Sequence, residues 1–545
     1  MIGDLRIDEK RKQLYYEKGY WGSGTLNDAW NARIREDDAR PYIKEAGSCA
    51  LTYGTVDDRA ARLAAWLSDE GIGNGDVVSF QVPQWTEFSV VYVACLKLGA
   101  VMHPISPRSD EEATVYALAK AESKAYLAPS TFRNIDYEER FERIAPRVPS
   151  IACALFIDRE SPIENPDHTT FSSVLETYRP YTMKCPSKSD DVACILATSG
   201  STGTPKLTLL THNNISFSER SYLSVLDLDK NDRMWMPSPL NHATGFFHGL
   251  IAVMLLGGCT ILQQGYTPQE AVRVINLEQC TWSHGATPFI YDILKYLRTT
   301  HSELPSLRLY LCGGAPVPSN LIREAYEHGI LLCESYGSTE SCPHVYVPPE
   351  KCLEWDGRWS GIPYEGIEIR AVDVNHCSVP PGVQGEEASR GPHQFVGYLN
   401  DPERTDRALD SDGWFYSGDL CFLDENGRVR INGRIKEIII RGGENISAIE
   451  VDASLAGCPG IRDFATIGMP DERLGERICT FVVPDGTPPT LDDVKAFLES
   501  RHVDKHLWPE RIELVERIPY TPTGKVQRHL LAREIACRMG RRKQT

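Results

Sequence analysis

The sequence lacks several features that would place it in common functional classes. Its 16 cysteines include no C-x-x-C pair, so neither a zinc site nor a disulfide framework is indicated. Scattered thiols fit a reducing environment, and we expect a cytoplasmic protein. Basic residues are too few to balance acidic ones, and the net charge of −17 disfavours binding to nucleic acid or anionic membranes.

No apolar run approaches the roughly 20 residues that a membrane-spanning helix needs. The longest such stretch, residues 250–262, is interrupted by glycines and predicts a core helix followed by a strand. The N-terminal segment mixes both charge signs and lacks the apolar centre of a secretory signal. We therefore expect no integral membrane span.

What the sequence does contain is an alternation of helical and strand patterns. Apolar residues recur at helical spacing over 53–66 after Thr52, a suitable N-cap, and 76–82 follows as a strand. A second helix is predicted over 86–98 and a second strand over 100–105. Such alternation predicts an α/β sheet, whose strand ends commonly bind ligands. Similar strands are expected at 193–197, 260–263, 281–285 and 307–312.

The pattern changes after Gly385, where short alternating segments separated by Asp-Gly, Asn-Gly and Gly-Gly turns predict a β-rich subdomain. A second α/β unit begins near Arg434, with a strand at 438–441 and an acidic helix at 449–455. We predict an α/β fold in which residues 1–434 form a large domain of stacked sheets with that subdomain. Residues 435–545 form a small C-terminal α/β domain.

The sharpest local feature is a glycine- and hydroxyl-rich loop after the predicted strand 193–197. Small residues let backbone amides surround phosphate oxygens, while hydroxyls and a lysine add donors and positive charge. The spacing does not fit G-x-x-x-x-G-K-[ST], which disfavours a P-loop NTPase, and a flexible Ser/Gly turn is the structural alternative. The candidate phosphate-binding residues are Thr198, Ser199, Gly200, Ser201, Thr202, Gly203 and Lys206.

Five further motifs follow this loop in order: Tyr336–Glu340, Gly413–Asp419, Gly433–Glu437, Gly442–Asn445 and Pro522–Lys525. Together with the loop, they resemble the motifs of the adenylate-forming superfamily, which includes acyl-CoA synthetases, luciferases and nonribosomal adenylation domains. The chain is most similar to bacterial short- to medium-chain fatty acyl-CoA synthetases. The resemblance implies an enzyme that uses ATP and Mg²⁺ to adenylate a carboxylic acid and then transfers the acyl group to coenzyme A.

Joining a carboxylate to the α-phosphate brings two anions together, so cations and oriented donors must offset their repulsion. By resemblance, Glu340 binds Mg²⁺, Thr339 bonds the α-phosphate, and Lys525 is the mobile catalytic lysine between the carboxylate and ATP. These residue types suit the roles, since Mg²⁺ prefers a few carboxylate and phosphate oxygens. Taken singly, a helix cap and a solvated lysine would be the ordinary interpretations.

The same resemblance assigns a nucleotide site. Asp419 would accept hydrogen bonds from the ribose hydroxyls, Arg434 would bind ribose or phosphate oxygens, and Tyr336 would stack near adenine. Ordinary packing, an Asx-turn or a surface ion pair would also explain these residues. The remaining nucleotide-binding candidates are Gly313, Gly314, Ala315 and Gly337.

Lys436 matches the family's hinge, so the C-terminal domain is expected to be mobile. Its rotation would withdraw Lys525 after adenylation and bring Gly442, Gly443 and Glu444 toward coenzyme A. One site could then serve both half-reactions. A tight turn at the two glycines is compatible with this role.

The acid is expected near His242, which resembles the family's gate residue, and near Gly285 and Ala286. No aspartate lies between residues 239 and 247 to pair with an α-ammonium, so an acid without an α-amine is favoured. Short- to medium-chain fatty acids are therefore the favoured substrates. Cyclic, aromatic or carnitine-like acids, and loading of a carrier protein, remain alternatives.

Leu207 departs from the family pattern, which commonly has glycine after the loop lysine. It either alters the loop or continues a supporting strand. The sequence defines no oligomeric state.

Overall fold

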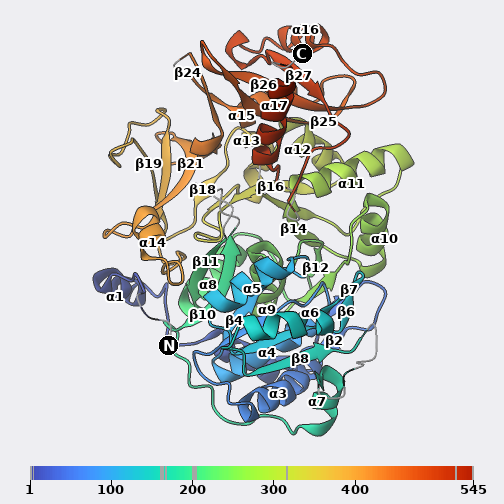
Figure 1. Ribbon diagram of the computed structural model, residues 1–545, viewed down its shortest axis with the longest axis vertical. Helices are drawn as coiled ribbons and strands as arrows, with labels where there is room; N and C mark the ends of the chain where they lie inside the picture. Colours follow the sequence, from blue (N-terminus) through green and yellow to red (C-terminus); the bar gives the residue numbers. More distant parts are fainter. Residues whose placement is uncertain are drawn as a thin grey trace.

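The computed structural model describes residues 3, 5–159, 165, 168–198, 205–314, 317–442, 444–521 and 525–542. Figure 1 shows the C-terminal elements gathered at one end of the molecule, with the helices of residues 53–69 and 171–177 at the other. The helices are α1 (Glu9–Glu17), α2 (Leu26–Asp37), α3 (Tyr53–Asp69), α4 (Glu87–Leu98), α5 (Glu111–Lys120), α6 (Tyr137–Ile144), α7 (Phe171–Thr177), α8 (His212–Ser224), α9 (Val253–Leu256), α10 (Pro268–Glu278), α11 (Thr287–Thr300), α12 (Ser319–Glu327), α13 (Cys352–Trp355), α14 (Pro402–Ala408), α15 (Ala448–Leu455), α16 (Leu491–Ser500) and α17 (Arg528–Arg542).

Two large sheets dominate the described part of the N-terminal region. One has the order β18 (Ile362–Pro363), β17 (Val345–Tyr346), β16 (Leu331–Tyr336), β15 (Leu309–Gly313), β14 (Trp282–Ala286), β12 (Arg233–Met236), β13 (Cys259–Leu262), β1 (Pro41–Glu45) and β2 (Leu51–Thr52). The other has the order β11 (Lys206–Thr211), β10 (Val192–Thr198), β4 (Val101–Pro104), β3 (Val77–Phe80), β5 (Ala125–Pro129), β8 (Cys153–Ile157) and β9 (Thr169–Thr170). A small hairpin joins β6 (Thr131–Phe132) and β7 (Ile135–Asp136).

The predicted helix–strand alternation is confirmed at the N-terminal side. The Thr52 hydroxyl accepts the Thr55 N–H and caps α3, and α4 ends at Gly99, whose φ is +73°. One core cluster joins α4 to both sheets through residues such as Phe80 and Leu262. Burial against two sheets explains why α4 is apolar on nearly all its faces.

The apolar stretch 250–262 also folds as expected, as a helix followed by a strand. A π-helical segment, Thr244–Ala252, runs into α9, and β13 follows. Within the described ranges, no helix combines the length and apolar character that a membrane crossing requires.

Leu207 lies in a regular strand. It pairs with Ala197 across β10 and β11, and its side chain is fully buried in a core cluster. The backbone there is extended, so this position does not need the conformational freedom of glycine. The structure therefore confirms the prediction that Leu207 continues a supporting strand.

The β-rich subdomain is confirmed, but it begins earlier than Gly385. Its antiparallel sheet is β19 (Glu368–Val372), β20 (Gly385–Arg390), β21 (Phe415–Leu423) and β22 (Val429–Arg434). After a short turn of 3₁₀-helix, Ile435–Glu437, the chain enters a separate sheet. That sheet contains β24 (Glu444–Ser447), β23 (Ile438–Arg441), β26 (Gly475–Pro484), β25 (Ile461–Asp471) and β27 (Arg511–Leu514), with core clusters of its own.

Candidate active site

A cleft of about 3560 Å³ lies where the N-terminal sheets meet the C-terminal region. The parallel strands β14, β15 and β16 end at its wall, which is the usual position of a ligand site in an α/β sheet. The cleft brings together most of the sequence-predicted residues that the structure describes. Those lining it are Thr198, Lys206, His242, Gly285, Ala286, Gly313, Gly314, Tyr336, Gly337, Thr339, Glu340, Asp419, Arg434, Lys436 and Lys525.

Other predicted residues are not among them. Gly442 and Glu444 flank the β23–β24 turn and do not line the cleft. Gly442 has a φ of +60°, as expected for a tight turn. Outside the described residues lie Ser199, Gly200, Ser201, Thr202, Gly203, Ala315 and Gly443.

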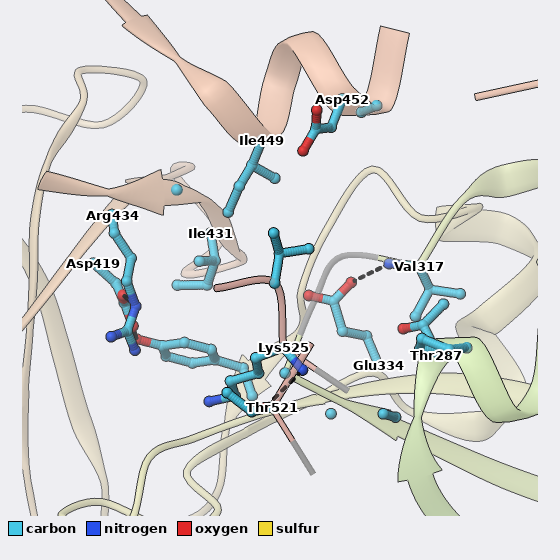
Figure 2. Close-up of a pocket in the computed structure, with 18 of the residues that line it drawn as sticks. Thr287, Val317, Glu334, Asp419, Ile431, Arg434, Ile449, Asp452, Thr521 and Lys525 are labelled. Carbon is cyan, nitrogen blue, oxygen red and sulfur yellow. Dashed lines mark hydrogen bonds and ion pairs between the residues drawn. The ribbon is translucent and has the colours of Figure 1, made fainter. Parts of the chain in front are cut away.

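Asp419 and Arg434 face each other across β21 and β22. Arg434 Nε lies 2.8 Å from Asp419 Oδ1, and the Tyr336 hydroxyl donates to Asp419 Oδ2 at 2.7 Å. Figure 2 shows the Asp419–Arg434 pair along one side of the pocket. Burial raises the pKa of Asp419, while Arg434 opposes this shift. The pair offers acceptors and a fixed cation side by side, which suits a polyhydroxyl group next to an anion.

Lys525 extends into the same cleft from the C-terminal region (Figure 2). Its backbone N–H donates to Thr521 Oγ1 at 3.0 Å, and Thr521 N–H donates back to the Lys525 carbonyl at 2.8 Å. A Cβ at Gly314 would lie 3.3 Å from Lys525 Cε, so glycine leaves room for the lysine stem. The Lys525 side chain is exposed to the open cleft, but protein atoms surround it on the other sides. This partial desolvation, followed by the charge of Arg434, lowers the pKa of Lys525.

Glu340 and Lys206 are joined through a residue that the sequence motifs did not identify, Tyr398. The Tyr398 hydroxyl donates to Glu340 Oε1 at 2.8 Å and accepts from Lys206 Nζ at 2.7 Å. Lys206 Nζ also lies 4.3 Å from the centre of the Tyr398 ring and 3.4 Å from Glu340 Oε1. The three side chains hold a cation and a carboxylate at fixed positions beside the end of the phosphate loop.

The predicted acyl residues also line the cleft. Burial, reinforced by the charge of Lys525, lowers the pKa of His242 to about 4, so its imidazole is neutral at pH 7. A Cβ at Gly285 would approach the Tyr310 hydroxyl oxygen to 2.5 Å, which explains a glycine there. The lining also includes His284, His248 and Cys342, which are not among the predicted site residues.

Comparison with known proteins decides the family. The model of the AMP-binding enzyme family matches residues 30–399, and that of the AMP-binding enzyme C-terminal domain matches residues 450–525. The chain belongs to the AMP-binding enzyme family. Members of this family therefore provide the relevant relatives and solved structures.

A medium-chain fatty-acid–CoA ligase of Escherichia coli (strain K12) is 40% identical over 537 residues, covering 98% of this chain and 94% of the relative. A feruloyl-CoA synthase of an Amycolatopsis species is 32% identical, covering 91% of this chain and 96% of the relative. Among solved structures, ATP-bound MatB from Rhodopseudomonas palustris has a TM-score of 0.82 and 25% identity, covering 94% of this chain and 99% of that one.

Proposed function

We propose that this AMP-binding enzyme is an ATP-dependent, AMP-forming acid:CoA ligase for short- to medium-chain fatty acids. One carboxylate oxygen of the acid attacks the α-phosphorus of ATP, giving acyl-AMP and pyrophosphate; the coenzyme A thiol then attacks the acyl carbonyl and releases AMP. The observation that carries the proposal is the convergence of Lys525, Asp419 and Arg434 in one cleft. The 40% identity to a medium-chain fatty-acid–CoA ligase supports the acid class.

The roles of individual residues are part of this proposal. Asp419 accepts the ribose hydroxyls, and Tyr336 together with Gly313–Gly314 borders adenine. Lys525 neutralises the approaching anions. His242, Gly285 and Ala286 contact the acid, and a neutral imidazole at His242 suits an uncharged acyl chain. Thr339 bonds the α-phosphate.

Mg²⁺ fits this site through a single protein carboxylate. The described residues contain no group of three or more His, Cys, Asp or Glu side chains arranged to hold a metal by themselves. Glu340 supplies one oxygen-bearing group beside Lys206, and Mg²⁺ in nucleotide sites is commonly held by one or two carboxylates plus substrate phosphates. When bound, the ion would neutralise phosphate charge during pyrophosphate departure.

The domain division follows the change of sheet. Residues 1–434 would form the AMP- and acyl-binding domain and residues 435–545 the mobile domain, because β22 and β23 belong to different sheets on either side of Ile435–Glu437. Rotation about Lys436 would bring Gly442, Gly443 and Glu444 to coenzyme A. A cytoplasmic location would give the enzyme access to the acid, ATP and coenzyme A. The cysteines in the described residues form no disulfides, as the reducing cytoplasm favours.

Product analysis tests the function. The enzyme is incubated with ATP, Mg²⁺, coenzyme A and a panel of fatty, cyclic, aromatic and carnitine-like acids, and thioesters are identified by mass spectrometry. Octanoyl-CoA or a neighbouring chain length should dominate. A dominant aromatic thioester would instead match the feruloyl-CoA synthase relative, acyl-AMP without thioester would indicate a carrier-protein acceptor, and no adenylate at all would overturn the proposal.

Replacing Tyr398 with phenylalanine is expected to lower kcat/KM for ATP by about tenfold, because a hydrogen bond to charged groups contributes about 1.5–3 kcal/mol. The ring and its contact with Lys206 remain, so the loss reports the hydroxyl that joins Lys206 to Glu340. Steady-state kinetics with varied ATP measure the effect. Tyr20→Phe is the control, because the Tyr20 hydroxyl lies 3.5 Å from Glu365 Oε1 and neither residue lines the cleft. An unchanged kcat/KM for ATP would contradict the role.

A further inference from the structure

The acyl side of the cleft continues beyond Ala286 along strand β14. Successive side chains of a strand point to opposite faces, so His284 lies on the same face as Ala286, and Gly285 lies on the other. On the neighbouring strand β15, Gly313 pairs with Ala286. His284 is 3% exposed and lines the cleft. The predicted acyl wall therefore leads from a small residue to a buried imidazole.

The missing side chain at Gly313 leaves one ring nitrogen of His284 uncovered. A Cβ at Gly313 would lie 3.2 Å from His284 Nε2 and 3.4 Å from the Ser335 carbonyl oxygen. The other ring nitrogen, Nδ1, lies 2.9 Å from the Tyr222 hydroxyl oxygen, while Nε2 has no hydrogen-bond partner among the described residues. Buried polar atoms are nearly always paired, so an unpaired one at a cleft wall indicates a ligand group.

The ring of His284 is held in place by two aromatic neighbours. It stacks on His248 with ring centres 4.5 Å apart and on Tyr222 with ring centres 5.6 Å apart. His248 is itself fixed, because its Nδ1 lies 2.9 Å from Oε2 of Glu219 on α8. These contacts hold Nε2 toward Gly313, and a hydrocarbon chain lying against it would leave it unpaired.

The hydrogen-bonding capacity of Nε2 follows from the neutral state of His284. Burial, reinforced by His248, lowers the pKa of His284 well below its usual value. In a neutral imidazole one nitrogen donates and the other accepts, and the Tyr222 hydroxyl can bond to either form of Nδ1. Nε2 is therefore an acceptor in one tautomer and a donor in the other. A hydroxyl group suits both tautomers, since it donates and accepts.

We propose that His284 is a specificity-determining residue and that the acyl site takes short- to medium-chain acids that carry a hydroxyl group on the chain. This inference rests on the proposed ligase function and narrows its acid class. The hydroxyl lies beside Gly313 and pairs with Nε2, while the hydrocarbon part of the chain contacts the rest of the wall. An unsubstituted acid of equal length offers no such partner, so the hydroxy acid is the better substrate.

Acid-dependent pyrophosphate release tests this preference. Octanoic acid is compared with each of its monohydroxy derivatives and with derivatives that carry a methyl group at the same position. One hydroxy acid should give a kcat/KM about tenfold above that of octanoic acid, whereas its methyl counterpart should not exceed octanoic acid. If every hydroxy acid lies at or below octanoic acid, the inference is overturned and the ligase function stands. No release with any acid would overturn both.

His284→Phe keeps an aromatic ring against His248 but removes both ring nitrogens. The ratio of kcat/KM for the preferred hydroxy acid to kcat/KM for octanoic acid should fall by about tenfold. This ratio cancels any general loss of activity, because both acids are measured on the same variant. An unchanged ratio would overturn the role of His284.

His103→Phe is the matched control. His103 is also fully buried, with Nδ1 2.7 Å from the Ser79 hydroxyl oxygen and Nε2 unpaired within the described ranges, but it does not line the cleft. Its substitution should leave the ratio at the wild-type value. Thermal melts confirm that both variants are folded before the assays. If His103→Phe lowers the ratio as much as His284→Phe does, the effect is general loosening and the assignment to His284 is wrong.

Discussion

Lys525→Ala is expected to slow adenylate formation by about 10²–10³-fold while changing thioester formation from supplied acyl-AMP by less than about threefold. Lys525 lies in the cleft near Gly314 and within electrostatic range of Asp419, Arg434 and Glu340. A cation at this position offsets the repulsion between the anionic acid and ATP. That repulsion arises in the first half-reaction alone. Once pyrophosphate has left, the second half-reaction brings in a thiol and no longer requires that charge.

The two half-reactions are measured separately, adenylation by acid-dependent pyrophosphate release and thioester formation from synthetic acyl-AMP and coenzyme A. Lys505→Ala, an exposed lysine of the same region, is the control and should match the wild type in both assays. Lys525→Arg keeps the positive charge but replaces the compact ammonium of lysine with a planar guanidinium. It therefore tests whether the geometry of the cation matters as well as its charge. Equal losses in both half-reactions would contradict the role given to Lys525.

Much of the architecture could be predicted because it depends on local patterns. The helices α3 and α4 follow from apolar spacing and from caps at Thr52 and Gly99, and β23 follows from a short β-branched run. The ordered motifs also predicted most of the residues that meet in the cleft, several of which, such as Gly313, Tyr336 and Arg434, lie at strand ends.

The contacts between distant segments could not be predicted in this way. Tyr398 joins Glu340 across 58 positions, and Cys342 meets His248 across 94, with no spacing rule that links either pair. The coenzyme A candidates show a different limit. Gly442 and Glu444 lie on either side of position 443 in the predicted turn, yet neither lines the cleft in the arrangement that brings Lys525 into it. A motif identifies residues, whereas their arrival at the site depends on the proposed rotation of the C-terminal domain.

Arg528→Met is expected to lower the free energy of unfolding of the C-terminal region by about 3 kcal/mol, because it leaves a largely buried carboxylate without its cation. Arg528 Nη2 lies 2.5 Å from Asp452 Oδ2, and Nη1 lies 3.2 Å from Glu437 Oε2. Its Nε–H also donates to the Thr466 carbonyl at 3.0 Å. The arginine therefore fastens the start of α17 to α15 and to the segment next to the proposed hinge.

The deficit should depend on pH in a defined direction. Burial, opposed by Arg528, raises the pKa of Asp452 to about 6 in the folded state. Since the unfolded carboxyl ionises near pH 3.8, the folded protein loses stability as pH rises through this interval and then levels off above about pH 6. Without Arg528 the folded pKa rises further, so the variant continues to lose stability above pH 6. Urea unfolding at pH 5 and pH 8 should show the larger deficit at pH 8.

A second substitution separates charge from packing. Asp452→Asn added to Arg528→Met removes the unpaired carboxylate, so it should restore part of the lost stability and abolish the pH dependence above pH 6. Because Arg528 also holds Glu437 beside Lys436, while Lys525 lies three positions before it, the double variant should still adenylate more slowly than the wild type. Full recovery of adenylation would limit Arg528 to stability, whereas a persistent loss with the fold restored would identify it as a positioning residue between the hinge and the catalytic lysine.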